Sequence, residues 1–167
     1  MNAAYAICVG ALASLISVHV LCAEPAKALV QPLGEFAQVR TTEDHAYGHA
    51  VRLWRSDGQL LGQILYWDAS PEAQRGSFAD GTYNRTTGAV RFNVVIVRRD
   101  VQPNERTEAS FEGVLAKGRL SGKLKWAGEI AKFRGKNGVE DLMLPLQKSE
   151  RLVSFASVEA WQRAVAE

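Results

Sequence analysis

The stretch from Thr107 to Trp126 restricts the fold of this chain more than any other, because strict alternation of side chains meets a tight turn there. Apolar residues and glycines occupy every second position on both sides of Lys117-Gly118: Phe111, Gly113, Leu115, Leu120, Gly122, Leu124 and Trp126. Period-two patterning with the register fixed by a turn predicts a β-hairpin with one buried face. Glycines inside both strands indicate sharp bending or close approach of the sheet, as at the corner of a barrel.

Similar signals recur along the chain after residue 28. Glycine and Asp/Asn turn signals return at roughly 8–12-residue intervals, the spacing of an all-β sandwich or barrel. Further strands are expected from Glu35 to Arg40, Gly48 to Arg55, Gln59 to Trp67, Gly76 to Asn84 and Ala89 to Arg98, with an eighth around Leu142, Leu144 and Leu146.

The meander of strands must hide its two edges, and closure into a barrel does so. We therefore predict an all-β fold: an antiparallel meander of about eight strands closed into a small barrel. A two-sheet β-sandwich is the alternative. A short C-terminal helix is expected to follow, with Ser157 as N-cap and an apolar stripe of Val158, Trp161 and Val165.

The first 28 residues have the composition of a signal peptide. An apolar run from Ala3 to Ala23 carries no charged side chain, and Ala26-Lys27-Ala28 supplies an A-x-A cleavage pattern. Cleavage after Ala28, or alternatively after Ala23, would leave residues 29–167 as a single periplasmic or secreted domain. An uncleaved membrane anchor and a lipoprotein acylated at Cys22 are the less favoured alternatives.

Composition narrows the chemistry further. Both cysteines, Cys8 and Cys22, lie in the expected leader, so the remaining domain has no disulfide. The net charge of +2 is too small to indicate nucleic acid as a partner. From Lys117 to Lys136 the chain has seven basic residues and one acid, which suits a weak contact with a membrane surface. A solvated strand face is the favoured interpretation of this segment.

At the level of architecture the chain resembles a calycin-type barrel, the group that contains lipocalins and avidin-like proteins. The resemblance rests on the meander, the terminal helix and the glycines within Phe-Glu-Gly-Val-Leu and Leu-Ser-Gly-Lys-Leu. Lipocalins usually carry Gly-x-Trp in the first strand, whereas this chain has Gly34-Glu35-Phe36. The resemblance implies a shape and a general habit of binding, and it identifies no individual binding residue.

A barrel of this size encloses space for side chains or for one small ligand. We expect an exported, non-enzymatic protein that binds a small apolar or amphiphilic ligand inside the barrel. The side chains whose alternation points inward are the candidate ligand contacts: Leu53, Ile64, Phe92, Val94, Phe111, Leu124 and Trp126. The alternative is a periplasmic protein-binding module, such as an inhibitor or immunity protein against a cell-wall enzyme or toxin. It would act through the loops from Asp68 to Arg75 and from Arg99 to Arg106.

One cluster suggests metal or general-base chemistry: His45 and His49, with Glu43 and Asp44 nearby. Histidines four residues apart align on a helix, but this segment leads into a strand through Gly48. An exposed polar loop is the better interpretation. The sequence contains no HExxH, no glycine-rich phosphate loop and no Gly-x-Ser-x-Gly. We therefore predict no catalytic residue, no metal site and no cofactor.

Overall fold

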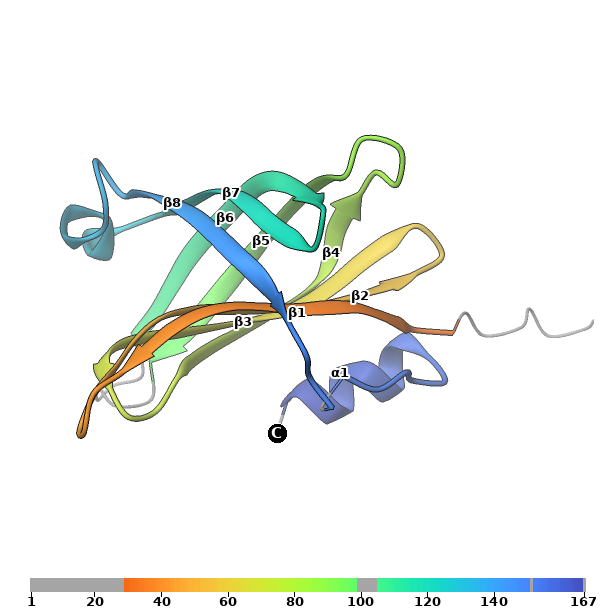
Figure 1. Ribbon diagram of the computed structural model, residues 1–167, viewed down its shortest axis with the longest axis horizontal. Coiled ribbons are helices and arrows are strands. Elements are labelled where there is room, and N and C mark those ends of the chain that lie inside the picture. The colour runs from red at the N-terminus through yellow and green to blue at the C-terminus, as the bar shows by residue number, and fades with distance from the viewer. Residues whose placement is uncertain (1–28, 99–104, 151, 167) are drawn as a thin grey trace, which may run out of the picture.

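The computed structural model describes residues 29–98, 105–150 and 152–166, so the expected leader lies outside the described residues. Eight strands, a short 3-10 helix and a C-terminal α-helix follow one another along the chain (Figure 1). Their bounds are β1 Gln31–Thr41, β2 Ala46–Ser56, β3 Gln59–Ser70, β4 Gln74–Tyr83, β5 Ala89–Arg98, β6 Glu105–Ala116, β7 Arg119–Trp126, η1 Glu129–Phe133, β8 Val139–Gln147 and α1 Val158–Ala166. Within the described ranges, no helix has the length and apolar character needed to cross a lipid bilayer.

The strands form one closed antiparallel barrel in sequence order, with β8 returning to β1. This confirms the predicted all-β meander closed into a barrel with a short C-terminal helix. The hairpin expected around Lys117-Gly118 is β6–β7, in which Gly113 lies opposite Gly122. Lys117 and Gly118 have φ angles of 50° and 70°. Positive φ at both central residues is the hairpin turn geometry that matches the natural twist of strands.

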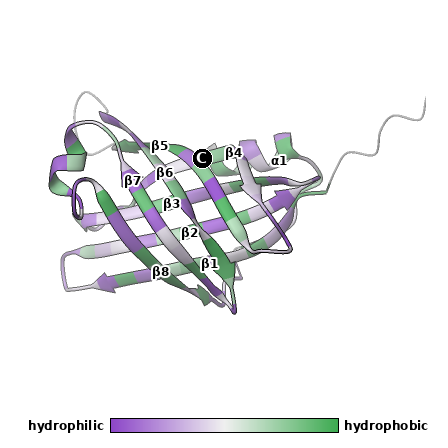
Figure 2. Ribbon diagram, turned by 90° about the horizontal axis from the view of Figure 1, so that it is seen from above, coloured by the Kyte–Doolittle hydropathy of each residue, from purple (hydrophilic) through white to green (hydrophobic). Residues whose placement is uncertain are grey.

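Apolar side chains from all eight strands fill the interior in one cluster. Three phenylalanines from consecutive strands stack within it: the Phe78 and Phe92 ring centroids are 4.1 Å apart, and those of Phe92 and Phe111 are 5.1 Å apart. Along the strands, hydrophobic and hydrophilic residues alternate (Figure 2). The alternation read from the sequence therefore describes the inner and outer faces of the barrel.

Helix α1 packs on the outside of the barrel rather than across its end. Trp161 is 1% exposed and forms a second apolar cluster with Val30, Trp54 and Leu61. The expected stripe is confirmed, since Val158 and Val165 pack against the same cluster as Trp161. Ser157 caps the helix, as expected, by accepting a hydrogen bond at 3.2 Å from the backbone N–H of Ala160.

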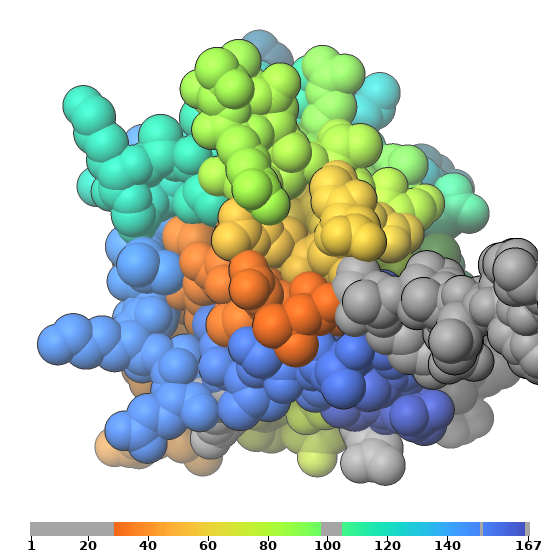
Figure 3. All heavy atoms as spheres, turned by 90° about the vertical axis from the view of Figure 1, so that its right-hand side faces the viewer, coloured from red at the N-terminus to blue at the C-terminus, as the bar shows by residue number. Residues whose placement is uncertain are grey.

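The segment before α1 is tied to the start of the sheet. Val30 and Phe155 exchange two backbone hydrogen bonds, at 2.9 and 3.0 Å. In Figure 3 the C-terminal residues, in blue, lie against the start of β1, in orange. The C-terminal segment thus covers the outer face of the sheet where β1 begins.

Strands β3, β4 and β6 extend into segments that were expected to be loops, which corrects two loops. β3 extends to Ser70, and β4 begins at Gln74, where Gln74 pairs with Tyr66. The loop expected from Asp68 to Arg75 therefore shrinks to residues 71–73. β6 begins at Glu105, and the loop from Arg99 to Arg106 lies mostly outside the described residues. Polar residues are frequent at these strand ends and, whether exposed or buried like Gln74, do not interrupt backbone pairing, so composition alone suggests a loop.

The barrel is incompletely paired at two junctions. β4 pairs with β5 only at its two ends, through Arg75↔Val97, Thr82↔Arg91 and Tyr83↔Val90. β1 pairs with β8 only at Glu35↔Gln147 and Phe36↔Leu146, and Figure 1 shows β8 crossing β1 at an angle. The eight strands nevertheless close into one barrel, with gaps in regular backbone pairing at these two junctions (Figure 1).

Candidate functional site

All seven predicted ligand contacts belong to the interior core and are 0–4% exposed: Leu53, Ile64, Phe92, Val94, Phe111, Leu124 and Trp126. Their side chains point inward, as alternation predicts. They pack in one cluster of buried residues, so a ligand would fit among them only if core side chains moved apart. Their role in binding stays a prediction.

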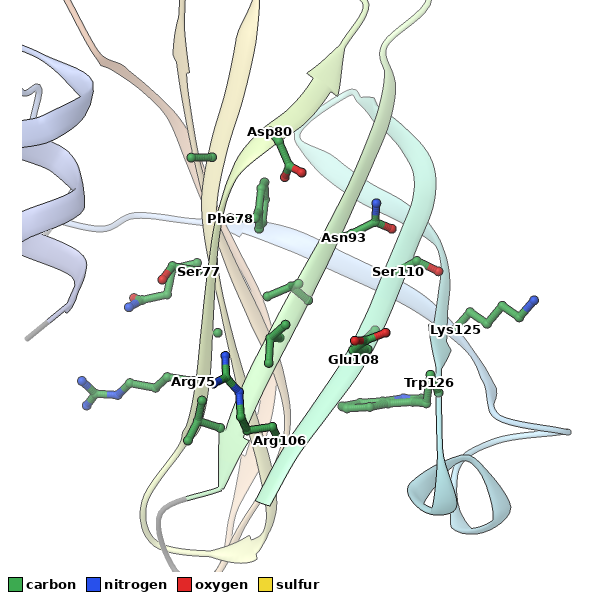
Figure 4. A pocket seen from close by; sticks show the side chains of 18 of the residues that line it. Arg75, Ser77, Phe78, Asp80, Asn93, Arg106, Glu108, Ser110, Lys125 and Trp126 are labelled. Atoms are coloured by element: carbon green, nitrogen blue, oxygen red, sulfur yellow. The ribbon is translucent and has the colours of Figure 1, made fainter. Parts of the chain in front are cut away.

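An open groove of about 990 Å³ lies on the outer face of β4–β7, beside Val165 near the end of α1 (Figure 4). Its polar lining comes from residues that alternate with core residues along each strand. Figure 4 shows this alternation at β7, where Lys125 and Trp126 leave the strand in opposite directions. Two of the seven predicted contacts, Val94 and Trp126, also line the groove.

The groove follows the junction where β4 and β5 are incompletely paired. Gly76, Ser77 and Phe78 line it from β4, and Asn93 and Val95 line it from β5. Backbone pairing is absent along this stretch of the described strands, whereas it is continuous from β5 through β6 to β7. The groove therefore runs beside a gap in regular backbone pairing. The two strands stay close there, since a Cβ added at Gly76 would lie 2.6 Å from the Val95 carbonyl oxygen.

The register places the outward side chains of the groove in cross-strand rows. In one row, Val97 of β5 lies between Arg75 of β4 and Arg106 of β6. In another, Asn93, Ser110 and Lys125 follow one another across β5, β6 and β7. Directly opposite residues in antiparallel strands have adjacent side chains. A bound molecule would therefore meet several of these groups at once.

The two arginines of this groove were not among the predicted site residues, because the strands begin earlier than expected. β4 was expected to begin at Gly76 and β6 at Thr107, which left Arg75 and Arg106 at the ends of loops. The signal that identifies them is register: once Phe92 pairs with Phe111, Arg106 must lie opposite Val97.

A second polar cluster lies at the barrel end next to η1 and includes His49. His49 was expected in an exposed polar loop, and this expectation is wrong. β2 begins at Ala46, so alternation with Val51 and Leu53 turns His49 inward. Its side chain is 12% exposed, and Nε2 lies 3.1 Å from Glu140 Oε2 of β8. His45, in contrast, is exposed in the turn before β2, as expected.

Arg134 completes this cluster from the loop that follows η1. Its guanidinium forms an ion pair with Asp68 and lies over the Tyr66 ring, 4.5 Å from the centroid. Burial raises the pKa of the Tyr66 hydroxyl, so this side chain stays neutral. The Tyr66 ring also contacts His49, with centroids 5.0 Å apart. These contacts link β2, β3, η1 and β8 at one end of the barrel.

The β1–β8 junction opens beside this cluster. A cavity of about 550 Å³ lies between the two strands and is lined by Gln38, Arg40, His49, Glu140 and Met143, among others. It corresponds to the stretch in which β1 and β8 are not paired. His49 and Glu140 line this cavity, and their side chains are 12% and 18% exposed.

The pH dependence of stability tests the His49–Glu140 contact. Burial alone would raise the pKa of Glu140, but its contact with His49 and the charge of Arg134 outweigh burial and lower the pKa below its usual 4.5. A lowered folded-state pKa contributes stability that is present above pH 4.5 and is lost as pH falls through the folded pKa. Glu140→Gln should lower the free energy of unfolding at pH 7 by about 1–2 kcal/mol. Between about pH 5 and 3 the stability of the variant should fall less steeply than that of the wild type.

Urea unfolding at a series of pH values measures both effects. Glu112→Gln is the control, because Glu112 is an exposed member of a surface ion pair with Arg91 and should change stability by less than about 1 kcal/mol. Parallel pH curves for wild type and Glu140→Gln would contradict the expected contribution of this pair.

The basic segment from Lys117 to Lys136 does not form one patch. Its residues run from the β6–β7 turn along β7 to the opposite end of the barrel, beyond η1. Ion pairs engage three of its seven cations: Lys123 with Asp141, Lys132 with Glu129 and Arg134 with Asp68. This dispersal favours the solvated strand face over a membrane-binding surface.

Neither metal chemistry nor comparison with known proteins assigns a role to these sites. Among residues 29–98, 105–150 and 152–166, no three His, Cys, Asp or Glu side chains converge as metal ligands. Comparisons with protein families, curated proteins and solved structures give no match to this chain. The function must therefore be argued from the cavities and their lining.

Proposed function

We propose that this is an exported, non-enzymatic binding protein that holds a small amphiphilic molecule in the outer groove of β4–β7. One observation carries the proposal: the barrel interior is packed with side chains, while an open groove of about 990 Å³ lies on the outer face. Small-molecule sites typically measure about 300–1,000 Å³, so the groove has a suitable size.

The lining suits a ligand with both polar and apolar parts. Val95, Val97 and Val165 supply apolar surface along the groove. Asn93 and Ser110 supply hydrogen-bonding groups, each of which can both donate and accept. Nine of the 19 lining residues are polar or charged, so the groove is more polar than a typical small-molecule site and suits an amphiphilic ligand better than a purely apolar one.

A bulky substitution in the groove tests the proposal. Ser110→Trp should fill the space between β5 and β7 and weaken binding of the uncharged probe N-phenyl-1-naphthylamine by roughly tenfold or more, about 1.4 kcal/mol. Val114→Trp is the matched control, because Val114 lies four residues further along the same outer face of β6, outside the groove lining. Fluorescence titration measures both, and circular dichroism confirms that both variants fold.

The wild type and Val114→Trp should show the same saturable binding at one site. Native mass spectrometry of the purified protein should in addition detect a co-purifying small molecule in the wild type and less of it in Ser110→Trp. Equal probe binding by Ser110→Trp and the wild type would rule out the groove as the ligand site.

A further inference from the structure

We infer that the groove ligand carries one anionic group, a carboxylate, sulfate or phosphate, which Arg106 binds with Arg75 as the second contact. The inference rests on the proposed function and adds the chemical class of the ligand. Four observations support it: the position of the two arginines, their lack of partners, a contrasting row of charges on the same face, and the acids beside them.

The two arginines flank a single valine. Arg75 and Arg106 lie opposite Val97 on its two sides, so one strand separates them. Neighbouring strands lie ~4.8 Å apart, which puts the two arginine backbones about 10 Å from each other. Arginine side chains are long enough to meet over Val97, and their planar donors suit carboxylate, sulfate and phosphate oxygens.

Neither arginine is neutralised within the part of the chain that the structure describes. Both are exposed, and neither forms an ion pair or hydrogen bond with a described residue. Two unpaired cations on one strip of sheet repel each other, and an anion placed between them removes this repulsion.

Another row of charges on the same outer face shows the opposite arrangement. There Arg91, Glu112, Lys123 and Asp141 follow one another across β5–β8. The Arg91–Glu112 pair is 2.5 Å long and the Lys123–Asp141 pair is 2.8 Å long. This row neutralises itself, whereas Val97 takes the place of an acid in the arginine row. The two rows of the same outer face therefore differ in charge: one is balanced by acids and the other, in the groove, is not.

Two acids limit how much negative charge the groove accepts. Glu108 follows Arg106 on the same outer face of β6, and Asp80 lines the β4 side of the groove. Each would repel a ligand with several negative charges. We therefore infer a single anionic group with the rest of the molecule extending over Val95 and Val97, and we exclude nucleic acids and other polyanions.

The two arginines contribute unequally in the arrangement that Figure 4 shows. Arg106 extends from β6 across toward β4, while Arg75 extends away from the groove on the far side of β4. Arg106 already reaches over the groove, and Arg75 must rotate to join it. The effect of removing Arg106 should therefore be the larger one.

Two dyes that differ by one sulfonate test the inference: 1-anilinonaphthalene-8-sulfonate and the uncharged N-phenyl-1-naphthylamine. The wild type should bind the sulfonate roughly tenfold more tightly than the uncharged dye. Arg106→Gln should remove most of this preference and Arg75→Gln a smaller part. Each variant should change the affinity for the uncharged dye less than the affinity for the sulfonate dye. Arg91→Gln, on the self-neutralised row, should leave the preference intact.

The outcomes separate this inference from the proposed function. If the wild type binds both dyes equally and Ser110→Trp weakens binding of both, the inferred anionic group is wrong. The groove remains a binding site in that case. Failure of Ser110→Trp to weaken either dye would overturn both. Inorganic sulfate at the dye concentration should not displace the sulfonate dye. If inorganic sulfate displaces the sulfonate dye as effectively as the dye itself does, the groove binds free anions. The inference of an amphiphilic ligand would then be wrong.

Discussion

Phe92→Ala should reduce the free energy of unfolding by about 3–5 kcal/mol, the usual cost of deleting a buried aromatic ring. The Phe92 ring is stacked between those of Phe78 and Phe111, with centroid distances of 4.1 and 5.1 Å. Its loss leaves a cavity that two rings held on separate strands cannot fill. The stack also joins β4 to β5 where their backbone pairing is incomplete, so side-chain packing carries more of that junction.

Equilibrium unfolding in urea measures this loss. The midpoint should fall while the dependence of the free energy on urea stays unchanged, because the surface exposed on unfolding is nearly the same. Val114→Ala is the control: this exposed outer position should change stability by less than about 0.5 kcal/mol. A loss below about 1 kcal/mol for Phe92→Ala would show that the interior has spare room. That result would favour a ligand inside the barrel over one in the groove.

Local patterning was sufficient to predict the barrel, because each strand carries its own inward and outward faces. The β6–β7 hairpin shows why: Lys117-Gly118 fixes the turn, and the turn fixes which residues face each other. The helix was predictable for a similar reason, since Ser157 and the stripe through Trp161 are local signals.

The candidate site was not predictable in the same way, because it depends on how strands meet. The gap in regular pairing between β4 and β5 has no local signature, and the groove runs beside it. Arg75 and Arg106 become neighbours only because both pair with Val97 of β5. His49 joins Glu140 across the β1–β8 junction, a contact between the two ends of the meander. Alternation assigns a face to a residue, whereas only register assigns its neighbours.

The glycine pair at the centre of the β6–β7 hairpin leads to the second large effect. A Cβ added at Gly122 would lie 2.5 Å from Gly113 Cα and 2.7 Å from Phe111 Cζ, with the Glu112 carbonyl oxygen closer still. Two of these three atoms belong to the backbone and cannot move without disturbing the strand pairing. The third belongs to the ring at one end of the phenylalanine stack. Gly122→Ala should therefore destabilise the protein by about 3 kcal/mol or more.

Gly128→Ala is the matched comparison, because it makes the same chemical change with a different penalty. Gly128 has a φ of 71° and nothing within 4 Å of an added Cβ, so only backbone strain opposes alanine there. With its ψ of −159°, this backbone conformation is one that essentially only glycine adopts, and the strain costs roughly 1–3 kcal/mol. Alanine also restricts the unfolded chain more than glycine does, and this stabilises the folded state by about 0.4–1 kcal/mol. Urea unfolding of both variants distinguishes the free-energy cost of steric overlap at Gly122 from that of backbone strain at Gly128. If Gly122→Ala costs no more than Gly128→Ala, then β6 and β7 are not in close contact at Gly122. The interior next to Phe111 would then have room for an added methyl group, which would weaken the argument that ligands bind in the outer groove rather than inside the barrel.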